Sequence, residues 1–201
     1  VYDITESFEF ESDMTLGNVV VPIILNATTA IDIDVPMAQG WNWMSLNVYT
    51  EDMSLNNMLL SLDDNAEYIK SQSGYADYYS DFGWFGTLEL MDNTSMFKLR
   101  MGAEDNIVLA GIPVDVENAI FDLASGWNWI GYSPQMTLDV NYALDNIPNG
   151  NAEYLKSQSG YADFYSDFGW FGTLEDMDPF LGYQLRLAIA TSFVYNDGEL
   201  Y

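Results

Sequence analysis

Aromatic and acidic side chains alternate within one short segment of the chain, and the pattern occurs twice. The side chains are Tyr75, Asp77, Tyr79 and Trp84 in the first segment and Tyr161, Asp163, Tyr165 and Trp170 in the second. Residues two apart lie on the same face of a strand. Aromatic rings stack on the C–H faces of sugars and carboxylates accept hydroxyl protons, so this pattern is typical of a carbohydrate-binding face. The alternative is that the rings pack in a core and only the tyrosine hydroxyls reach its rim.

The same segments carry pairs of aspartates four residues apart. The pairs are Asp77 with Asp81 and Asp163 with Asp167. Ca²⁺ takes six to eight oxygen ligands, so a loop rich in aspartate and asparagine is permissive for it. Calcium is therefore the candidate cofactor, although no stretch matches the EF-hand loop. The alternative is a solvated acidic surface.

These candidate residues lie in an internal repeat. Residues 65–89 read NAEYIKSQSGYADYYSDFGWFGTLE, and residues 151–175 read NAEYLKSQSGYADFYSDFGWFGTLE. The offset of 86 residues, from position 65 to position 151, also relates Trp41 to Trp127, Trp43 to Trp129 and Arg100 to Arg186. Such self-similarity predicts one structural unit made twice. We expect an N-terminal strand over 1–15, a first repeat over 16–111, and a second repeat with a trailing strand over 112–201.

Hydrophobic periodicity predicts the elements of each repeat. In the first we expect strands near 16–25, 30–35, 41–46, 84–88, 96–101 and 106–109, a helix over 54–62, and a hairpin of 67–72 with 75–80. Ser54 is the expected N-cap of the helix. Matching Ser54 to Thr137 predicts that the loop before the second helix is three residues shorter. The expected class is α+β and β-rich, with two tandem copies of an antiparallel sheet that each carry one short helix.

A separate expectation concerns the burial of the tryptophans in the strand at 41–46. Trp41 and Trp43 are two residues apart and share a face. Large aromatic side chains dominate core burial, so we expect both to pack in the core.

Four of the five basic residues recur at the repeat offset. Lys70 matches Lys156 and Arg100 matches Arg186, whereas Lys98 lies opposite Gln184. A cation that occurs twice at the same place in an acidic chain predicts a fixed carboxylate partner. The candidate partners are Glu67, its counterpart Glu153, and the aspartates of the hairpin.

Charge and composition exclude several classes of function. The formal net charge is −26, from 31 acidic and 5 basic residues. Nucleic-acid binding needs a positive surface, and anionic membranes repel such a chain. No apolar run is long enough to span a membrane, so we expect no membrane insertion. Self-repulsion is relieved by salt or divalent cations, which favours a salty or calcium-bearing exterior.

The residue inventory argues against an enzyme. Without cysteine or histidine, the chain forms no disulfide, thiolate or imidazole metal site, and no Ser-His or Cys-His nucleophile. A glycosidase needs two carboxylates at a fixed separation, but 31 acids make chance pairs uninformative. The chain begins at Val1, so we expect a processed protein or a segment of a longer one.

Several longer motifs occur together. They are GWNW at 40–43 and 126–129, YIKSQSGYADYY at 68–79 with its copy at 154–165, GWFGTLE at 83–89 and 169–175, and MDPFLGYQLRL at 177–187. As a set they resemble the GWNWIS-type tandem modules of secreted and cell-surface proteins, chiefly of Bacteroidetes-like bacteria, with relatives in large algal viruses. The resemblance implies an exported or surface context and supplies no catalytic residue. The first repeat departs from it by lacking the proline and glycine of Pro179 and Gly182.

These observations lead to one functional expectation and one alternative. We expect an extracellular or surface-exposed structural or adhesive protein, such as a subunit of a fibre, filament or surface layer. The alternating strand outside the first repeat could join the sheet edge of a second copy or of a neighbouring domain. That strand could also pair within its own chain. The alternative function is a carbohydrate-binding module, whose partners are glycans.

Overall fold

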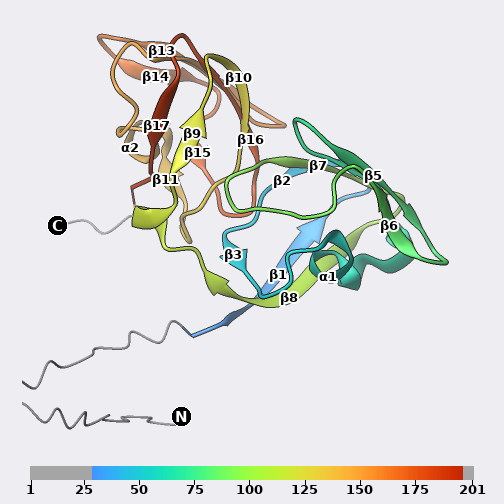
Figure 1. Cartoon of the computed structure of the whole chain (residues 1–201). Helices are drawn as coiled ribbons and strands as arrows, with labels where there is room; N and C mark the ends of the chain where they lie inside the picture. Colours follow the sequence, from blue (N-terminus) through green and yellow to red (C-terminus); the bar gives the residue numbers. More distant parts are fainter. Residues whose placement is uncertain (1–28, 197–201) are drawn as a thin grey trace, which may run out of the picture.

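The computed structural model describes residues 29–196. In this range short antiparallel strands dominate and helical turns are few, which confirms the expected β-rich α+β class (Figure 1). The strand predicted over 1–15 and those predicted near 16–25 lie outside the described residues. Assembly through the N-terminal strand therefore stays a prediction.

The chain forms two units in sequence order. The first contains β1 Ile31–Met37, β2 Gly40–Met44, β3 Val48–Tyr49, α1 Leu55–Met58, η1 Leu60–Asn65, β4 Ala66–Lys70, β5 Tyr75–Tyr79, β6 Gly83–Gly86, β7 Phe97–Met101 and β8 Asp105–Pro113. The second contains η2 Val116–Asn118, β9 Phe121–Leu123, β10 Gly126–Ile130, β11 Leu138–Asp139, α2 Val140–Ala143, β12 Ala152–Lys156, β13 Tyr161–Tyr165, β14 Gly169–Gly172, β15 Asp176–Met177, β16 Tyr183–Leu187 and β17 Thr191–Phe193. β8 passes the expected boundary at 111 because its last two residues pair with β3.

A five-stranded antiparallel sheet forms the centre of each unit. The strand order is β2-β7-β4-β5-β6 in the first unit and β10-β16-β12-β13-β14 in the second. The pairing registers of the two sheets match residue for residue at the repeat offset, including a bulge in β4 and in β12. In Figure 1 the first sheet lies at the right and the second at the upper left.

Each unit has its own hydrophobic core. One face of the first sheet contributes Ile69, Ala76 and Leu99, all fully buried, and α1 covers it with Leu55 and Met58. The second core contains the equivalent residues Leu155, Ala162 and Leu185 together with Val140 and Ala143 of α2. The other face of each sheet, called the outer face below, carries no helix of its own unit.

The helix caps agree with one prediction and correct another. Ser54 caps α1, since its hydroxyl accepts the Asn57 N–H at 3.4 Å. The cap of α2 is Asp139 rather than Thr137, because the Asp139 carboxylate accepts the N–H groups of the first helical turn. Thr137 instead donates its hydroxyl to Asp178. The predicted match of Ser54 to Thr137, and with it the loop shortened by three residues, was wrong.

Candidate functional site

The strand register places five side chains in one row across the outer face of the first sheet. Trp41 pairs with Arg100, Arg100 with Tyr68, Tyr68 with Asp77, and Asp77 with Phe85. Directly paired residues share a face of a sheet. The second sheet repeats the row with Trp127, Arg186, Tyr154, Asp163 and Phe171. Each outer face therefore alternates aromatic rings with charged groups.

The tryptophans of these rows are not core residues. Trp41 is 42% exposed and Trp127 is 45% exposed, which corrects the expectation that Trp41 and Trp43 pack in the core; Trp43 is only partly buried. The reason is that Asn42 and Met44 occupy the inward positions of β2. The Asn42 amide there hydrogen-bonds both the N–H and the C=O of Ala38.

The candidate ligand-binding residues divide between the two faces. Tyr75, Asp77, Tyr79 and their counterparts Tyr161, Asp163 and Tyr165 lie on the outer faces, and the four tyrosine rings are exposed. Trp84 and Trp170 lie on the inner faces and are only 8% and 7% exposed. The structure therefore removes these two tryptophans from the candidate set. Trp41 and Trp127 take their place.

The short helices hold Trp84 and Trp170 in the cores. The Asn56 side chain accepts the Trp84 N–H at 2.9 Å, and Asn141 accepts the Trp170 N–H at 2.6 Å. The preceding Gly83 has a positive φ of 80°, and a Cβ there would lie 2.2 Å from the Asn56 Oδ1. A side chain at this position would therefore push the Asn56 side chain away and break its hydrogen bond with the Trp84 N–H.

Three aromatic rings form a tier on each outer face. Trp41 contacts Tyr68 edge-on at 6.0 Å between ring centroids, and Tyr68 stacks on Tyr75 at 6.0 Å. In the second unit Trp127, Tyr154 and Tyr161 form the same tier, at 5.8 and 5.9 Å. Burial raises the pKa of the Tyr68 hydroxyl, and the Asp77 carboxylate raises this pKa further. The tier is thus a continuous apolar strip with polar groups along its edge.

An open groove lies on the outer face of the second sheet. Its volume is about 550 Å³, and it is lined by Trp127, Glu153, Tyr154, Lys156, Asp163, Gln184 and Arg186. The groove therefore combines two rings of the tier with hydrogen-bonding groups of both charges.

The two arginines have the carboxylate partners that the sequence predicts. Arg100 Nε lies 3.0 Å from Glu67 Oε2, and Arg186 Nε lies 3.0 Å from Glu153 Oε2. About half of each side chain is exposed, so solvent screening makes these pairs a small contribution to stability. Their effect is to orient the guanidinium groups between the aromatic rings.

The lysines pack against tryptophan rings instead. Lys98 Nζ lies 3.8 Å from the Trp43 ring and 4.3 Å from the Trp129 ring, within the range of a cation–π contact. Lys70 lies 5.4 Å from the Trp41 ring, and Lys156 lies 5.7 Å from the Trp43 ring. Desolvation lowers the pKa of Lys98, and the charges of Lys70 and Lys156 lower it further.

Reciprocal contacts join the two units beside this cluster. The Gln158 amide accepts the Trp43 N–H at 2.7 Å and donates to the Trp41 carbonyl at 2.7 Å. Gln72 binds the backbone of Trp129 and Trp127 in the same way, at 2.7 and 2.9 Å. Each glutamine therefore covers the edge strand of the other unit, where exposed backbone groups would otherwise invite pairing with another chain.

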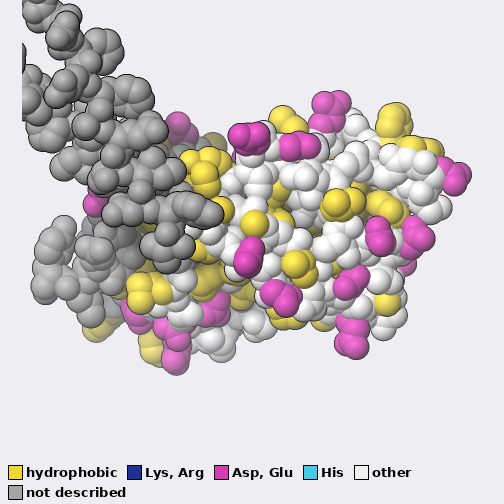
Figure 2. Space-filling view, turned by 90° about the horizontal axis from the view of Figure 1, so that it is seen from below, with side chains coloured by type: hydrophobic (Ala, Val, Ile, Leu, Met, Phe, Trp, Pro, Cys, Tyr) yellow, Lys and Arg dark blue, Asp and Glu magenta, His cyan; other side chains and the backbone are white. Residues whose placement is uncertain are grey.

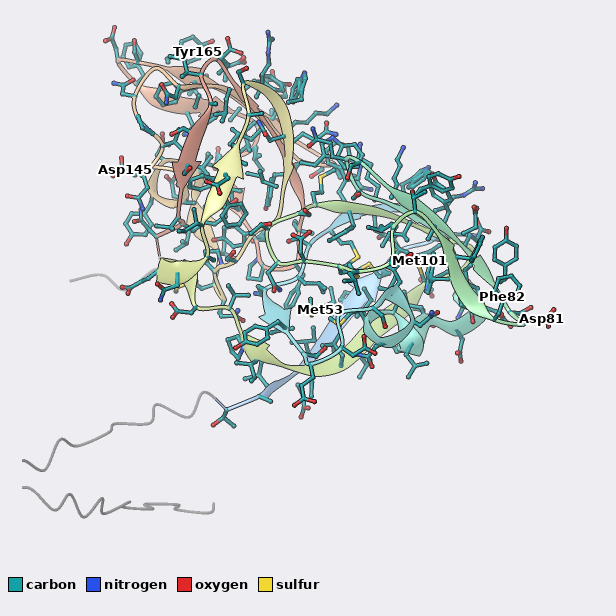
Figure 3. The ribbon with its side chains drawn as sticks, viewed as in Figure 1. Met53, Asp81, Phe82, Met101, Asp145 and Tyr165 are labelled. Carbon is teal, nitrogen blue, oxygen red and sulfur yellow. The ribbon has the colours of Figure 1, made fainter. Side chains whose placement is uncertain are left out.

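The candidate calcium ligands do not converge. Asp77 lies in the outer row, whereas Asp81 lies at the tip between β5 and β6 (Figure 3). Asp163 and Asp167 occupy the matching positions of the second unit. Among residues 29–196, no three acidic side chains gather closely enough to hold a metal ion. In the same range no helix has the length and hydrophobicity to cross a membrane.

Acidic side chains cover other parts of the surface. Figure 2 shows a face on which aspartate and glutamate are scattered among apolar patches and no basic side chain is visible. The five basic residues instead lie on β4, β7, β12 and β16, within the outer faces. The candidate site therefore carries the positive charge of the molecule as well as its exposed aromatic rows.

Comparison with known proteins adds no further assignment. No protein-family model, no curated protein and no solved structure matches this chain. The resemblance to GWNWIS-type modules therefore stays a prediction.

Proposed function

We propose that this protein is a non-catalytic carbohydrate-binding module with an adhesive role in an extracellular or surface-exposed setting. The observation that carries the proposal is the exposed aromatic row, which occurs on both sheets. Trp41 and Tyr68 are separated by Arg100 and followed by Asp77. Ring faces of this kind stack on the apolar face of a sugar, while the charged groups bind its hydroxyls.

The groove on the second sheet supports the same proposal. Its volume of about 550 Å³ falls within the range of small-ligand sites, roughly 300–1,000 Å³. Trp127 and Tyr154 supply apolar area in it, and Asp163 supplies an acceptor. Glu153, bound to Arg186, has its charge offset locally. A binding role without catalysis agrees with a chain that lacks histidine and cysteine.

A printed array of neutral and acidic glycans would test the proposal, followed by calorimetry with each glycan that binds. The paired variant Trp41→Ala/Trp127→Ala removes one stacking ring from each unit. Loss of a central aromatic anchor costs at least about 2 kcal/mol, so affinity should fall more than about tenfold. Leu60→Ala is the matched control, because Leu60 is 69% exposed on η1, away from both outer faces.

Two results would contradict carbohydrate binding. One is an array on which the wild-type protein binds no glycan. The other is an affinity that is the same in the wild-type protein and in Trp41→Ala/Trp127→Ala. Weakening by Leu60→Ala to the same degree would indicate a general loss of stability instead of a lost stacking contact.

A second role, assembly with further copies of this chain, is favoured by a separate observation. Exposed aromatic side chains lie at and beside the hairpin tips: Tyr79, Phe82 and Phe85 in the first unit, and Tyr165, Phe168 and Phe171 in the second. Phe82 and Tyr165 lie at opposite ends of the molecule in Figure 3. Clustered exposed apolar groups commonly mark interaction surfaces. Contacts at two opposite ends would allow an open chain of subunits.

Sedimentation velocity over a range of protein concentrations would test assembly. We expect species larger than a monomer that become smaller in the variant Phe82→Ser/Phe168→Ser. A wild-type protein that stays monomeric at every concentration in native salt would contradict this second role. It would leave carbohydrate binding unaffected.

A further inference from the structure

All five basic side chains of this acidic chain gather on the outer faces of the two sheets. They are Lys70 on β4, Lys98 and Arg100 on β7, Lys156 on β12 and Arg186 on β16. The chain as a whole has a formal net charge of −26. Such segregation concentrates positive charge beside the exposed aromatic rows.

The arginine charges are offset locally, but the lysine charges are not. Arg100 and Arg186 each pair with a glutamate. Within residues 29–196 these are the two salt bridges, and no described carboxylate lies within 4.0 Å of a lysine ammonium. Neither Lys70 nor Lys156 therefore forms a described salt bridge, although Asp163 lines the same groove as Lys156.

Lys98 is distinct from the other two lysines. Its ammonium lies between the rings of Trp43 and Trp129, at 3.8 and 4.3 Å. With its amide oxygen turned toward the lysine, Gln184 accepts from Lys98 Nζ at 3.1 Å. These contacts confine the Lys98 ammonium to the junction of the units. Lys70 and Lys156 make longer contacts with the rings, at 5.4 and 6.0 Å for Lys70 with Trp41 and Trp129 and at 5.7 Å for Lys156 with Trp43, so their ammonium groups are held less closely.

We propose that Lys70 and Lys156 form an anion subsite that takes the carboxylate or sulfate groups of an acidic polysaccharide. The proposal rests on the proposed carbohydrate binding and names the class of its ligand. Lys70 Nζ lies 5.4 Å from the Trp41 ring, and Lys156 lines the groove together with Trp127. A sugar stacked on the exposed part of either indole, 42% for Trp41 and 45% for Trp127, would thus hold an anionic substituent near an ammonium group.

The acidic remainder of the surface restricts where an acidic polysaccharide can bind. A polyanion is repelled from a face such as that in Figure 2, where acidic side chains are exposed and no basic one is visible. Complementary potentials select the orientation of an encounter more than they set its affinity. The outer faces, where the five basic side chains lie, are therefore the described surface on which an acidic polysaccharide meets positive charge. Asp163 and Glu153, which also line the groove, accept hydroxyl protons from the sugar.

Calorimetry with two matched pairs of polymers tests the subsite at about 0.15 M salt, where the Debye length is about 8 Å. One pair is polygalacturonate and its methyl ester, and the other is dextran sulfate and dextran. The wild-type protein should bind the acidic member of at least one pair about tenfold more tightly, as expected for a charge-assisted hydrogen bond. The pair that shows the preference distinguishes carboxylate from sulfate.

Lysine variants then test whether Lys70 and Lys156 cause the preference for the acidic polymer. Lys70→Gln/Lys156→Gln should remove this preference, so that the acidic and the neutral polymer of each pair bind with equal affinity, whereas Lys70→Arg/Lys156→Arg should retain the preference. Millimolar acetate or sodium sulfate should not abolish binding, because free anions lack the stacked sugar.

Different outcomes separate the two proposals. Equal affinity for both members of both pairs overturns the anion subsite and leaves carbohydrate binding standing. A preference that persists in Lys70→Gln/Lys156→Gln also overturns the subsite, since the selectivity then has another origin. Absence of binding to every polymer and to the glycan array overturns both proposals together.

Discussion

Replacing Gln158 with alanine should lower the free energy of unfolding by about 1 kcal/mol. The Gln158 amide bridges the Trp43 N–H and the Trp41 carbonyl of the other unit, both at 2.7 Å. A single hydrogen bond contributes about 0.5–1.5 kcal/mol net, so the two together contribute about 1–3 kcal/mol. Fixing a glutamine side chain costs up to about 2 kcal/mol of entropy. The net contribution of the Gln158 side chain to the free energy of unfolding is therefore about 1 kcal/mol.

Thermal and urea unfolding would measure the loss. For a chain of 201 residues, a change of 1 kcal/mol shifts Tm by about 2–4 °C. Gln72→Ala should cause an equal shift, since Gln72 makes the reciprocal contacts. Ser159→Ala is the matched control, because Ser159 is exposed in the same turn and only its backbone N–H is hydrogen-bonded.

The double variant Gln72→Ala/Gln158→Ala tests whether the junction stays closed. Backbone bonds between the units, such as Ser45 N–H to Phe180 O at 2.8 Å and Gly131 N–H to Thr94 O at 2.7 Å, do not involve either glutamine. The two losses should therefore add to within about 0.5 kcal/mol. If Ser159→Ala destabilises as much as Gln158→Ala, or if neither glutamine variant shifts Tm, the reasoning about these contacts is refuted.

Other predictions concern packing, titration and the surface ion pairs. In Gly182→Ala the new Cβ would lie 2.2 Å from Met96 Cγ and 2.7 Å from the Met44 carbonyl oxygen; because the carbonyl cannot move aside, urea unfolding should register a loss of about 1–3 kcal/mol. Burial raises the pKa of the Tyr132, Tyr183 and Tyr195 hydroxyls. Above about pH 10 the unfolded chain releases these protons and the folded chain keeps them, so stability should fall with rising pH. Absorbance at 295 nm should show three tyrosines that ionise only on unfolding. Arg100→Ala should change Tm by less than about 2 °C, because its pair with Glu67 is half exposed.

The sequence was sufficient for features that depend on local chemistry. The predicted hairpin of 67–72 and 75–80 corresponds to β4 and β5, whose turn closes with the Ser71 hydroxyl accepting the Gly74 N–H at 3.0 Å. Ser54 caps its helix as expected. Such features are set by residues that are close together in the chain, so the local sequence is enough to predict them.

Which face of each strand is buried could not be predicted from the local sequence. Alternation predicts that Trp41 and Trp43 share a face, but both faces of these sheets carry aromatic rings. The short helix covers one face, and this long-range contact decides that Trp84 is buried while Trp41 is exposed. The lysine contacts with tryptophan had no local signal either, because Lys98 and Trp129 meet across two units.

The departure of one basic residue from the repeat also has a structural explanation. Lys98 and Gln184 occupy equivalent positions on β7 and β16, and they meet at the junction. With its amide oxygen turned toward the lysine, Gln184 accepts from Lys98 Nζ at 3.1 Å and from the Trp129 indole N–H at 2.8 Å. A lysine at both positions would place two ammonium groups together with no acceptor between them. A glutamine at both would leave Trp43 and Trp129 without the cation that now lies between their rings. With one lysine and one glutamine, both tryptophan rings contact a cation and the glutamine oxygen has donors to accept from. The difference between Lys98 and Gln184 therefore follows from two equivalent strands that contribute to a single small site.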